Sequence, residues 1–339
     1  MVEVLVTGGA GFIGSNFVRF ALAAHEDWRV TTLDKLTYCG RRENLHDVLA
    51  HPRHEFVHGD IRDASISAPL VARADVVVHF AAETHVDRSI HAAGDFIRTD
   101  VEGTFVLLEA ARAAGRLRRF VQISTDEVYG SVATGSSRET DEIKPRNPYA
   151  ASKAGADRLA YSYWATYGVP ILITRASNNY GPYQFPEKII PLFVTNALEN
   201  RGVPLYGDGM NVRDWLHVSD HCRAVDLLIE QGVNGEVYNV GGGNEITNRE
   251  LTDRVLSILD KPLALIEPVA DRQGHDRRYS LDSSKLRATG WTPLVPFEEG
   301  LRETIEWYRT NEWWWRPITE QDEGFRRYYE AQYSAKRHA

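Results

Sequence analysis

The sequence of 339 residues predicts an α/β fold, a doubly wound parallel sheet with helices on both faces and a smaller, interleaved C-terminal lobe. Two observations predict this fold. Short runs rich in β-branched residues alternate with longer amphipathic stretches, and a group of glycines directly follows the first run, where a helical pattern opens. The short runs are apolar throughout rather than alternating, which is typical of parallel strands buried on both faces.

The part of the chain up to residue 175 supplies the alternating elements. We predict strands at residues 2–7, 28–33, 55–58, 76–80, 119–124 and 170–175. Helices are predicted at residues 15–24, near 99–114 and at 149–167. After Arg175, glycine-rich turns separate shorter elements, so residues 176–339 are predicted to form the smaller lobe over the carboxyl edge of the sheet. The parts 1–175 and 176–339 are expected to interleave, so this boundary is approximate.

Composition narrows the class of protein. The net charge of -8 gives no electrostatic reason to expect binding to nucleic acid or to a membrane. Two cysteines, Cys39 and Cys222, are too few for a disulfide framework, and no zinc-ligand spacing is present, so no metal is predicted. The chain opens with a strand pattern rather than a signal peptide, and no apolar run reaches transmembrane length. We therefore expect a reduced, cytoplasmic protein.

Three glycines follow the first predicted strand at a spacing that suits a dinucleotide. Gly8, Gly11 and Gly14 lie in the stretch Thr-Gly-Gly-Ala-Gly-Phe-Ile-Gly, and the helical pattern opens directly after them. Glycine lets the backbone turn tightly and approach a pyrophosphate, and the free N–H groups at the helix start then face the phosphates. A glycine triplet also fits an ordinary strand–helix turn, but the flanking strand and helix favour a Rossmann-type dinucleotide site.

Residues at the ends of other predicted strands extend this site. Asp34 lies about 20 residues beyond Gly14, where a carboxylate accepts hydrogen bonds from the ribose hydroxyls of NAD and repels the extra phosphate of NADP. The alternative for Asp34 is a solvated aspartate, and the adjacent Lys35 weakens the preference for NAD over NADP. Further candidates follow the third and fourth strands: Asp60, Ile61, Phe80, Ala81 and Ala82.

Tyr149 and Lys153 form the second strong signal. Pro148 suits the first turn of a helix, and at positions i and i+4 the two side chains share the face that would meet the cofactor. A phenol with a pKa of about 10 is a poor base, and a nearby ammonium together with the cationic nicotinamide ring favours the phenolate. Tyr149 could then take the proton of a sugar hydroxyl while the carbon-bound hydrogen leaves as hydride.

Two adjacent carboxylates, Asp126 and Glu127, come directly after the predicted strand at 119–124, in Ser124-Thr125-Asp126-Glu127. An alcohol dehydrogenase or an epimerase needs only a hydroxyl at this place, whereas elimination of water needs both a base and an acid. Neighbouring like charges raise one pKa, which favours a protonated Asp126. The alternative is that the carboxylates cap the next turn. Side chains of an extended segment point in opposite directions, so we expect the backbone to bend here.

Together these motifs resemble the extended short-chain dehydrogenase/reductase family and, within it, the dTDP-glucose 4,6-dehydratases, over nearly the whole chain. The triplet Thr125-Asp126-Glu127 is quite specific to the dehydratases. The departures are small: Thr84 stands where many relatives have serine, and Cys39 where alanine is common. The matching segments are residues 6–15, 80–90, 124–130, 147–153, 177–193, 204–217 and 271–279.

The resemblance implies the conversion of dTDP-glucose to dTDP-4-keto-6-deoxyglucose. Tyr149, tuned by Lys153, would take the proton of the C4 hydroxyl, which Thr125 would hold, while hydride passes to NAD. Glu127 would remove the C5 proton, Asp126 would protonate the departing C6 hydroxyl, and hydride would return to C6. Residues 1–175 would then carry NAD and the catalytic groups, and residues 176–339 would mainly bind the nucleotide sugar.

The resemblance also implies two sets of binding residues. The NAD set is Gly8, Gly11, Phe12, Ile13, Gly14, Asp34, Lys35, Thr37, Asp60, Ile61, Phe80, Ala81, Ala82, Thr99, Ser124, Tyr149, Lys153 and Asn179. The substrate set is Thr84, Thr125, Asn178, Glu187, Lys188, Ile189, Pro204, Tyr206, Arg213, Asn248, Arg272, His275 and Tyr279. Guanidinium groups such as Arg213 and Arg272 suit a diphosphate, although a lone arginine is commonly a surface charge. Asn248 also fits a helix cap, and Tyr206 a packing aromatic.

Two other functions compete with this hypothesis. A nucleotide-sugar 4-epimerase would use the same NAD, threonine, tyrosine and lysine but has no leaving hydroxyl for Asp126 to protonate. A non-catalytic NAD-binding regulator commonly lacks the tyrosine–lysine pair. The base of the substrate could be thymine, uracil or guanine, and the resemblance favours dTDP. It also implies a homodimer, with the helices near 99–114 and at 149–167 forming a four-helix interface.

Overall fold

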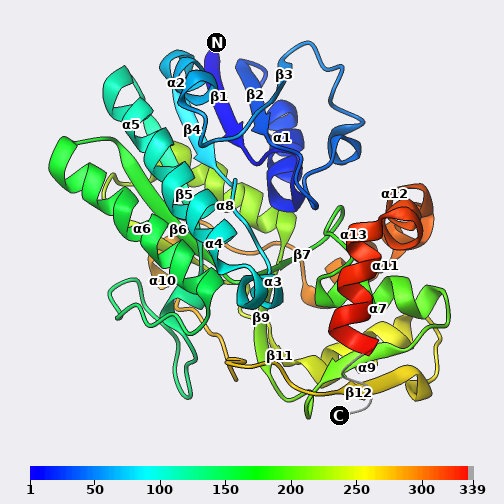
Figure 1. Cartoon of the computed structure of the whole chain (residues 1–339). Helices are drawn as coiled ribbons and strands as arrows, with labels where there is room; N and C mark the ends of the chain where they lie inside the picture. The colour runs from blue at the N-terminus through cyan, green and yellow to red at the C-terminus, as the bar shows by residue number, and fades with distance from the viewer. Residues whose placement is uncertain (335–339) are drawn as a thin grey trace.

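The structure is a computed structural model that describes residues 1–334. Its largest element is a parallel sheet of seven strands in the order β10-β6-β5-β4-β1-β2-β3 (Figure 1). The chain first adds β2 and β3 on one side of β1 and then adds β4, β5 and β6 on the other side. The strand order therefore reverses between β1 and β4, and ligands bind at this point in such folds. The strands are β1 Val2–Thr7, β2 Trp28–Asp34, β3 His54–His58, β4 Val76–His79, β5 Arg119–Thr125, β6 Ile171–Ala176 and β10 Val237–Val240.

Helices cover both faces of this sheet, as the sequence predicts. On one face α2, α5 and α6 pack on each other and on the strands, and on the other α1 packs on α8. The bounds of these helices are α1 Phe12–Ala24, α2 Ala64–Arg73, α5 Thr104–Ala114, α6 Pro148–Tyr167 and α8 Val218–Gln231. Shorter elements complete this part: η1 Arg42–Leu45, α3 Val86–His91, α4 Ala93–Phe96, the π-helical turn η2 Ile97–Gly103, the 3-10 turn η3 Asp126–Tyr129 and α10 Ser284–Arg287.

The six predicted strands are confirmed, with ends that differ by a residue at most. The strand β10 and the helix α8 lie beyond residue 175 and yet belong to the large sheet and its cover. The two predicted parts therefore interleave: residues after 175 contribute to the large sheet and its helices as well as to the smaller part.

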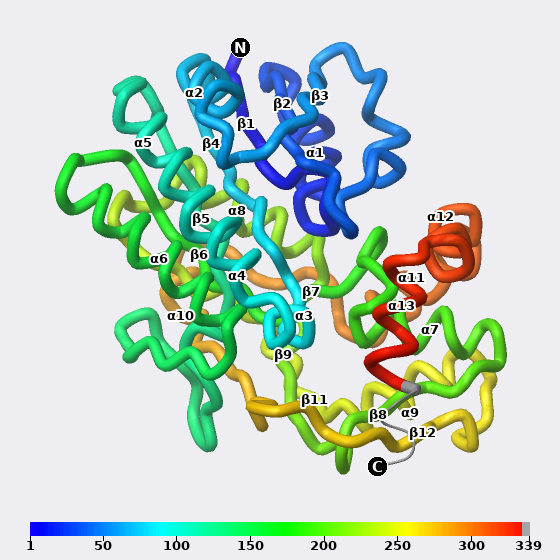
Figure 2. Tube along the Cα trace, viewed as in Figure 1, coloured from blue at the N-terminus to red at the C-terminus, as the bar shows by residue number. Residues whose placement is uncertain are grey.

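The remaining elements form a smaller part with its own apolar core. Helices α7, α9, α11 and α12 surround that core, and Figure 2 shows the last helix, α13, beside α7. Trp314 and Trp315 are buried there, whereas their neighbour Trp313 is exposed. The bounds are β7 Asn178–Tyr180, α7 Ile189–Leu198, β8 Val203–Tyr206, β9 Val212–His217, β11 Glu245–Thr247, α9 Asn248–Ile258, η4 Leu263–Leu265, β12 Ile266–Val269, α11 Phe297–Thr310, α12 Glu312–Arg316, η5 Pro317–Gln321, α13 Glu323–Tyr329 and η6 Glu330–Ser334.

The structure of residues 1–334 bears on disulfides, membrane-spanning helices and metal sites. Both cysteines, Cys39 and Cys222, are free thiols. No helix in this described range has the length and apolar character needed to cross a membrane. Over the same range, the His, Cys, Asp and Glu side chains form no group of three or more that could hold a metal ion.

Candidate active site

The turn between β1 and α1 has room for a ligand only because its glycines lack side chains. Gly8 has a φ of 71°, and a Cβ built there would lie 2.5 Å from the backbone nitrogen of Ala81. A Cβ on Gly14 would lie 2.2 Å from the carbonyl oxygen of Gly8. Gly11 begins α1 without a side-chain cap, so the first amides of this helix keep their capacity to bind an anion.

These glycines line a cavity of about 270 Å³ at the carboxyl edge of the sheet. The structure brings every residue of the predicted NAD set to its wall. They are Gly8, Gly11, Phe12, Ile13, Gly14, Asp34, Lys35, Thr37, Asp60, Ile61, Phe80, Ala81, Ala82, Thr99, Ser124, Tyr149, Lys153 and Asn179. Cys39, Gly40 and Gly59 also line the wall and were not predicted.

Asp34 ends β2 with its carboxylate held by the backbone. Its Oδ2 accepts from the amide of Ala10 at 2.9 Å and its Oδ1 from the amide of Leu36 at 2.8 Å. Burial raises the pKa of Asp34 above its ordinary value. Lys35 points to another acid, with its Nζ 2.9 Å from Oδ2 of Asp60. Since Asp60 balances the lysine charge, Lys35 detracts less from the preference for NAD than its position in the sequence suggests.

Tyr149 and Lys153 lie on the first turns of α6. Asn147 caps this helix by accepting from the amide of Ala150 at 2.8 Å, and Pro148 occupies the first helical position, as predicted. The ammonium of Lys153 donates to the carbonyl of Ile123 at 2.7 Å, which fixes it beneath the cavity. Burial lowers the pKa of Lys153, and the nearby Asp100 opposes that shift.

The predicted acidity of Tyr149 needs a correction. Burial, followed by the charges of Glu127 and Asp100, raises the pKa of Tyr149 well above its ordinary value, and hydrogen bonds to Thr125 and Thr84 only partly oppose this. The protein without a cofactor therefore keeps the phenol protonated. Lys153, whose ammonium donates to a backbone carbonyl, does not offset the effect of burial and the two acids on this phenol.

The carboxylate pair lies on a bend of the backbone, as predicted. The 3-10 turn η3 follows β5 directly, and Thr125 caps it by accepting from the amide of Glu127 at 3.3 Å. Thr125 also donates to Oδ1 of Asp126 at 3.1 Å. Burial, followed by the charge of Glu127, raises the pKa of Asp126 well above its ordinary value, which favours the protonated form of this acid. The cap of this turn is thus the threonine rather than either carboxylate.

Glu127 faces the opening between two cavities. Its Oε2 accepts from the phenol of Tyr279 at 3.3 Å and from the amide of Asn147 at 3.4 Å. Both contacts are long for hydrogen bonds, so the carboxylate is only loosely held and can accept a proton from a ligand.

Asp100 is a buried acid beside the tyrosine–lysine pair that the sequence did not single out. It lies on η2, next to Thr99 of the NAD set. Its Oδ1 accepts from the amide of Glu83 at 2.7 Å, and its Oδ2 accepts from the hydroxyl of Ser152 at 2.6 Å. Burial raises the pKa of Asp100 to about 7.

A second cavity of about 130 Å³ adjoins the first, and Asn178, Glu187 and Lys188 line both. It gathers residues that are far apart in the sequence. The predicted substrate residues on its wall are Asn178, Glu187, Lys188, Ile189, Pro204, Tyr206, Arg213, Asn248, Arg272, His275 and Tyr279. The other two members of that set, Thr84 and Thr125, line the first cavity.

The basic groups of the second cavity are held in different ways. Arg213 donates to the carbonyl oxygens of Val212 at 2.7 Å and Asp276 at 3.0 Å and stacks on the ring of Tyr279. Asn248 is not the cap of its helix, because Thr247 accepts from the amide of Glu250 at 3.0 Å.

Within residues 1–334, these two cavities contain buried polar atoms without a hydrogen-bond partner. Buried polar groups are nearly always paired in folded proteins, so such atoms indicate a missing ligand. They are Ser124 Oγ, Asp126 Oδ2, Asn178 Oδ1, Gln184 Oε1, Glu187 Oε1, Trp215 Nε1, His221 Nε2, Asn248 Oδ1 and Arg272 Nε.

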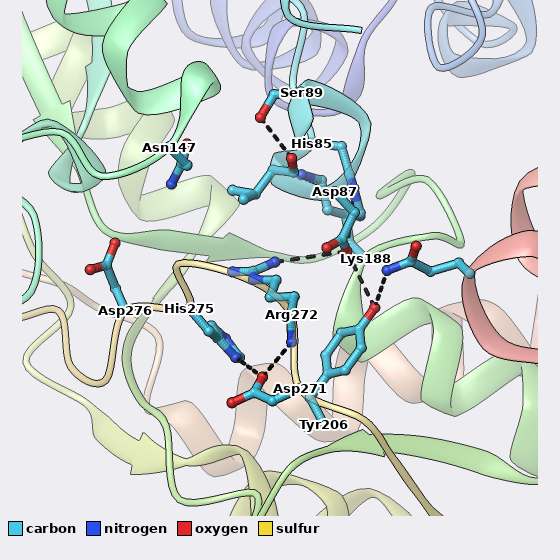
Figure 3. Close-up of polar contacts among 12 residues, drawn as sticks. His85, Asp87, Ser89, Asn147, Lys188, Tyr206, Asp271, Arg272, His275 and Asp276 are labelled. Carbon is cyan, nitrogen blue, oxygen red and sulfur yellow. Dashed lines mark hydrogen bonds and ion pairs between the residues drawn. The ribbon is translucent and has the colours of Figure 1, made fainter. Parts of the chain in front are cut away.

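Other residues at the second cavity were not predicted. Arg88 reaches the cavity through the wall residue Glu187, with Nε 2.8 Å from Oε2, and stacks on the ring of Tyr38. Asp87 lies beside Arg272 and Tyr206 (Figure 3). Tyr333, from η6, forms part of the wall. Asp87 and Arg88 belong to the matching segment 80–90, but nothing in the local sequence assigns them to the second cavity, and Tyr333 meets it from a distant segment.

Comparisons with known proteins agree with this geometry. The sequence profile of the GDP-mannose 4,6 dehydratase family matches residues 5–304. The chain is 54% identical over 329 residues to the dTDP-glucose 4,6-dehydratase of Streptomyces antibioticus, covering 95% of this chain and 97% of that one. Among solved structures, DesIV, a dTDP-glucose 4,6-dehydratase from Streptomyces venezuelae with NAD bound, has a TM-score of 0.91 and 54% identity, covering 94% of this chain and 100% of DesIV. The UDP-glucose 4-epimerase of Thermotoga maritima has a TM-score of 0.84 and 31% identity, covering 92% of this chain and 100% of the epimerase.

Proposed function

We propose that this chain, which belongs to the GDP-mannose 4,6 dehydratase family, is a dTDP-glucose 4,6-dehydratase that uses NAD. The observation that carries the proposal is the position of Asp126 and Glu127 in the same cavity as Tyr149. An epimerase has no use for a neutral carboxylic acid beside a carboxylate, whereas removal of water requires one group to give a proton and one to take it.

NAD fits the first cavity. Glycines keep side chains out of the turn that would face the pyrophosphate, the start of α1 offers free amides, and Asp34 supplies acceptors for the ribose. When it is bound, NAD supplies the group that accepts a hydride from C4 of the sugar and returns it to C6. The same carboxylate of Asp34 disfavours a phosphate on that ribose, which supports NAD rather than NADP.

The chain's own groups would prepare the first step. Tyr149 is the base for the C4 hydroxyl, with Thr125 and Thr84 as its hydrogen-bond partners. Lys153 is fixed by the carbonyl of Ile123 and brings a positive charge to the base of the cavity. The cationic ring of the cofactor adds a second positive charge there, and both lower the high pKa that burial gives to Tyr149.

Elimination would then use the two carboxylates in complementary states. Oxidation at C4 makes the hydrogen at C5 acidic, and the loosely held Glu127 takes it. The buried, protonated Asp126 gives its proton to the departing C6 hydroxyl, and its Oδ2 has no partner within residues 1–334 that would compete. Because the two side chains start from one 3-10 turn, a single bend of the backbone places the acid and the base on the same ligand.

The substrate set would hold the rest of the nucleotide sugar in the second cavity. Arg213, Arg272 and His275 surround the place for a diphosphate, and Tyr206 offers a face for the base. Asn178 and Asn248 bring unpaired carbonyl oxygens within the described chain. The assignments of single residues to the sugar, the diphosphate or the base are part of this proposal.

The homodimer and the cytoplasmic location belong to the same proposal. The helices α5 and α6 carry exposed aromatic rings, with Phe105, Tyr161 and Tyr167 each exposed by 39% or more, which suits a four-helix interface between two copies. The free thiols of Cys39 and Cys222 suit a reducing compartment.

The direct test is incubation of the purified protein with dTDP-glucose and no added NAD. A dehydratase that retains its cofactor yields a 4-keto-6-deoxy product lighter by one water, detected by mass spectrometry. A product of unchanged mass with inverted C4 would instead establish an epimerase. Absence of any product even with added NAD would refute the proposed activity. UDP-glucose and GDP-mannose serve as controls for the base.

A further inference from the structure

Asp87 places a buried negative charge next to Arg272 in the second cavity, whose wall also carries Arg213 and Lys188. It lies on α3, and its side chain is 4% exposed. Its Oδ2 lies 3.8 Å from Nη1 of Arg272, 3.8 Å from Nδ1 of His85, and accepts from the phenol of Tyr206 at 3.4 Å. Figure 3 shows the carboxylate between the guanidinium and the phenol.

His85, although it lies near Asp87, does not neutralise the charge of this carboxylate. Burial, followed by the charges of Lys188 and Arg272, holds the pKa of His85 well below its ordinary value, so the imidazole is neutral. Burial also opposes the charge on Arg272, and Asp87, ahead of Glu127, is the neighbouring charge that contributes most to keeping the pKa of Arg272 above its ordinary value. Asp87 is thus the main counter-ion of this arginine.

Arg272 is held loosely for a buried guanidinium. Its side chain is 16% exposed, and its Nε has no hydrogen-bond partner within residues 1–334. Nη1 of Arg272 lies 3.8 Å from the carboxylate of Asp87. A charge-assisted hydrogen bond is about 2.7–2.9 Å long, so this pair is too far apart for one. Arg272 therefore keeps donors for a ligand while Asp87 balances its charge.

We infer that Asp87 is a resident counter-ion that stabilises Arg272 in the empty site and weakens the binding of the nucleotide diphosphate. The inference rests on the proposed function, because it takes the diphosphate of a nucleotide sugar as the ligand of Arg272. A buried cation without a partner is costly, so the carboxylate stabilises the empty protein. Once a diphosphate lies on the guanidinium, the same carboxylate faces like charges in a site of low polarity and repels them.

This arrangement would help a product that carries the same nucleotide diphosphate as the substrate to leave. The acid of α3 acts on Arg272 and Tyr206, and it is a positioning residue rather than a catalytic one. Its effect has opposite signs on the empty and the bound protein, which a purely structural residue does not show.

The test compares wild-type protein with Asp87→Asn, which removes the charge and keeps an acceptor for Tyr206. Thermal unfolding of the NAD-loaded protein and calorimetric binding of dTDP are measured at low and moderate salt. We expect a lower Tm for the variant without nucleotide, together with tighter dTDP binding, on the order of fivefold to tenfold at low salt and less at moderate salt. Asp253→Asn, an exposed partner of Arg249 with Nε 3.1 Å from Oδ1, is the matched control and changes neither quantity.

Weaker or unchanged dTDP binding by Asp87→Asn would overturn the inference. Wild-type protein that does not bind dTDP at all would instead refute the proposed function, so the two failures are distinguishable. If Asp87→Asn does not fold, the variant with both Asp87→Asn and Arg272→Gln decides, because it removes both buried charges. Recovery of folding supports the pairing of the two charges, and failure to recover overturns it.

Discussion

The two adjoining cavities are built from different materials. The first is formed largely by backbone and glycines at the ends of parallel strands, and of its acids Asp34 is held by backbone amides and Asp60 by a lysine. The second is formed by buried charged and aromatic side chains from segments on either side of residue 200, among them Asp87, Arg213 and Arg272. The first is shaped mainly by backbone, whereas the second depends on charged side chains that come from distant segments.

This difference teaches that shape and charge were built by separate parts of the chain. The carboxyl ends of parallel strands converge by topology, so a dinucleotide site follows from one local motif and the order of strands. Charged groups from distant segments come together only through packing, and each buried one needs a partner in the protein or a ligand. Asp126 and Glu127 lie on η3, where Asp126 is buried with a raised pKa and Glu127 is partly exposed.

Removal of the buried acid on this turn should have the largest effect. For Asp126→Asn we expect kcat to fall by about 10²–10⁴-fold, equivalent to roughly 3–5 kcal/mol of barrier, because no group remains to protonate the departing hydroxyl. Oxidation at C4 should still proceed, so the absorbance of reduced nicotinamide should appear and persist. The exposed Glu142→Gln is the control. Full activity of Asp126→Asn would refute the assigned role.

A methyl group at the glycine turn should break the first cavity. For Gly14→Ala the new Cβ meets the backbone oxygen of Gly8, which cannot move aside as a side chain could. We expect a loss of about 1–3 kcal/mol of stability and loss of retained NAD, measured by thermal unfolding and by the nucleotide content after gel filtration. Gly94→Ala, whose Cβ would meet only the flexible guanidinium of Arg98 at 3.4 Å, should retain NAD. Normal NAD content in Gly14→Ala would contradict the fit.

The buried acid beside the first cavity should show itself in the pH dependence of stability. The pKa of Asp100 is raised to about 7 in the folded protein, so the folded state holds a proton that the unfolded state has lost. Between pH 5 and pH 7 this costs stability as the pH rises, and the cost is constant above pH 7. For Asp100→Asn we expect stability relative to wild type to rise by on the order of 2 kcal/mol from pH 5 to pH 8. A difference that is flat with pH would contradict this assignment.

A single unpaired amide in the second cavity should have the smallest effect. For Asn248→Ala we expect KM for dTDP-glucose to rise by about fivefold to tenfold, equivalent to roughly 1 kcal/mol, with little change in kcat, because one uniform binding contact is lost. Steady-state kinetics measure both. Arg249→Ala, the next residue, pairs with Asp253 at the surface and should leave KM unchanged. A loss of kcat in Asn248→Ala would instead place this residue at the chemistry.

The sequence predicted the order and nearly the bounds of the first six strands, because each is a continuous apolar run flanked by turn residues. It did not predict β10 as part of the same sheet. That strand has only four residues, and its place beside β6 depends on a chain that leaves the sheet and returns. The helix α8, which covers α1, was missed for the same reason.

For the candidate site, the motifs placed all predicted residues at the two cavities, although their single roles stay predictions. The electrostatics were predicted less well. The raised pKa of Asp126 was expected from Glu127, and burial contributes more. The phenolate of Tyr149 was expected from Lys153 together with the cationic nicotinamide ring, and in the protein without a cofactor burial and two acids raise the pKa of this phenol. Local sequence shows which charges are neighbours along the chain but not how much water surrounds them.

The sequence by itself determined the parallel sheet, the glycine turn at the end of β1, the one helical face shared by Tyr149 and Lys153, and the carboxylate pair at the end of β5. These depend on interactions between residues that are close along the chain, where periodicity and backbone sterics are sufficient. Only the tertiary structure decided how deeply Asp126 is buried, that Asp100 lies beside Lys153, and that Asp87 faces Arg272. Burial and contacts between distant segments set these states, because the energy of a charge depends on everything packed around it.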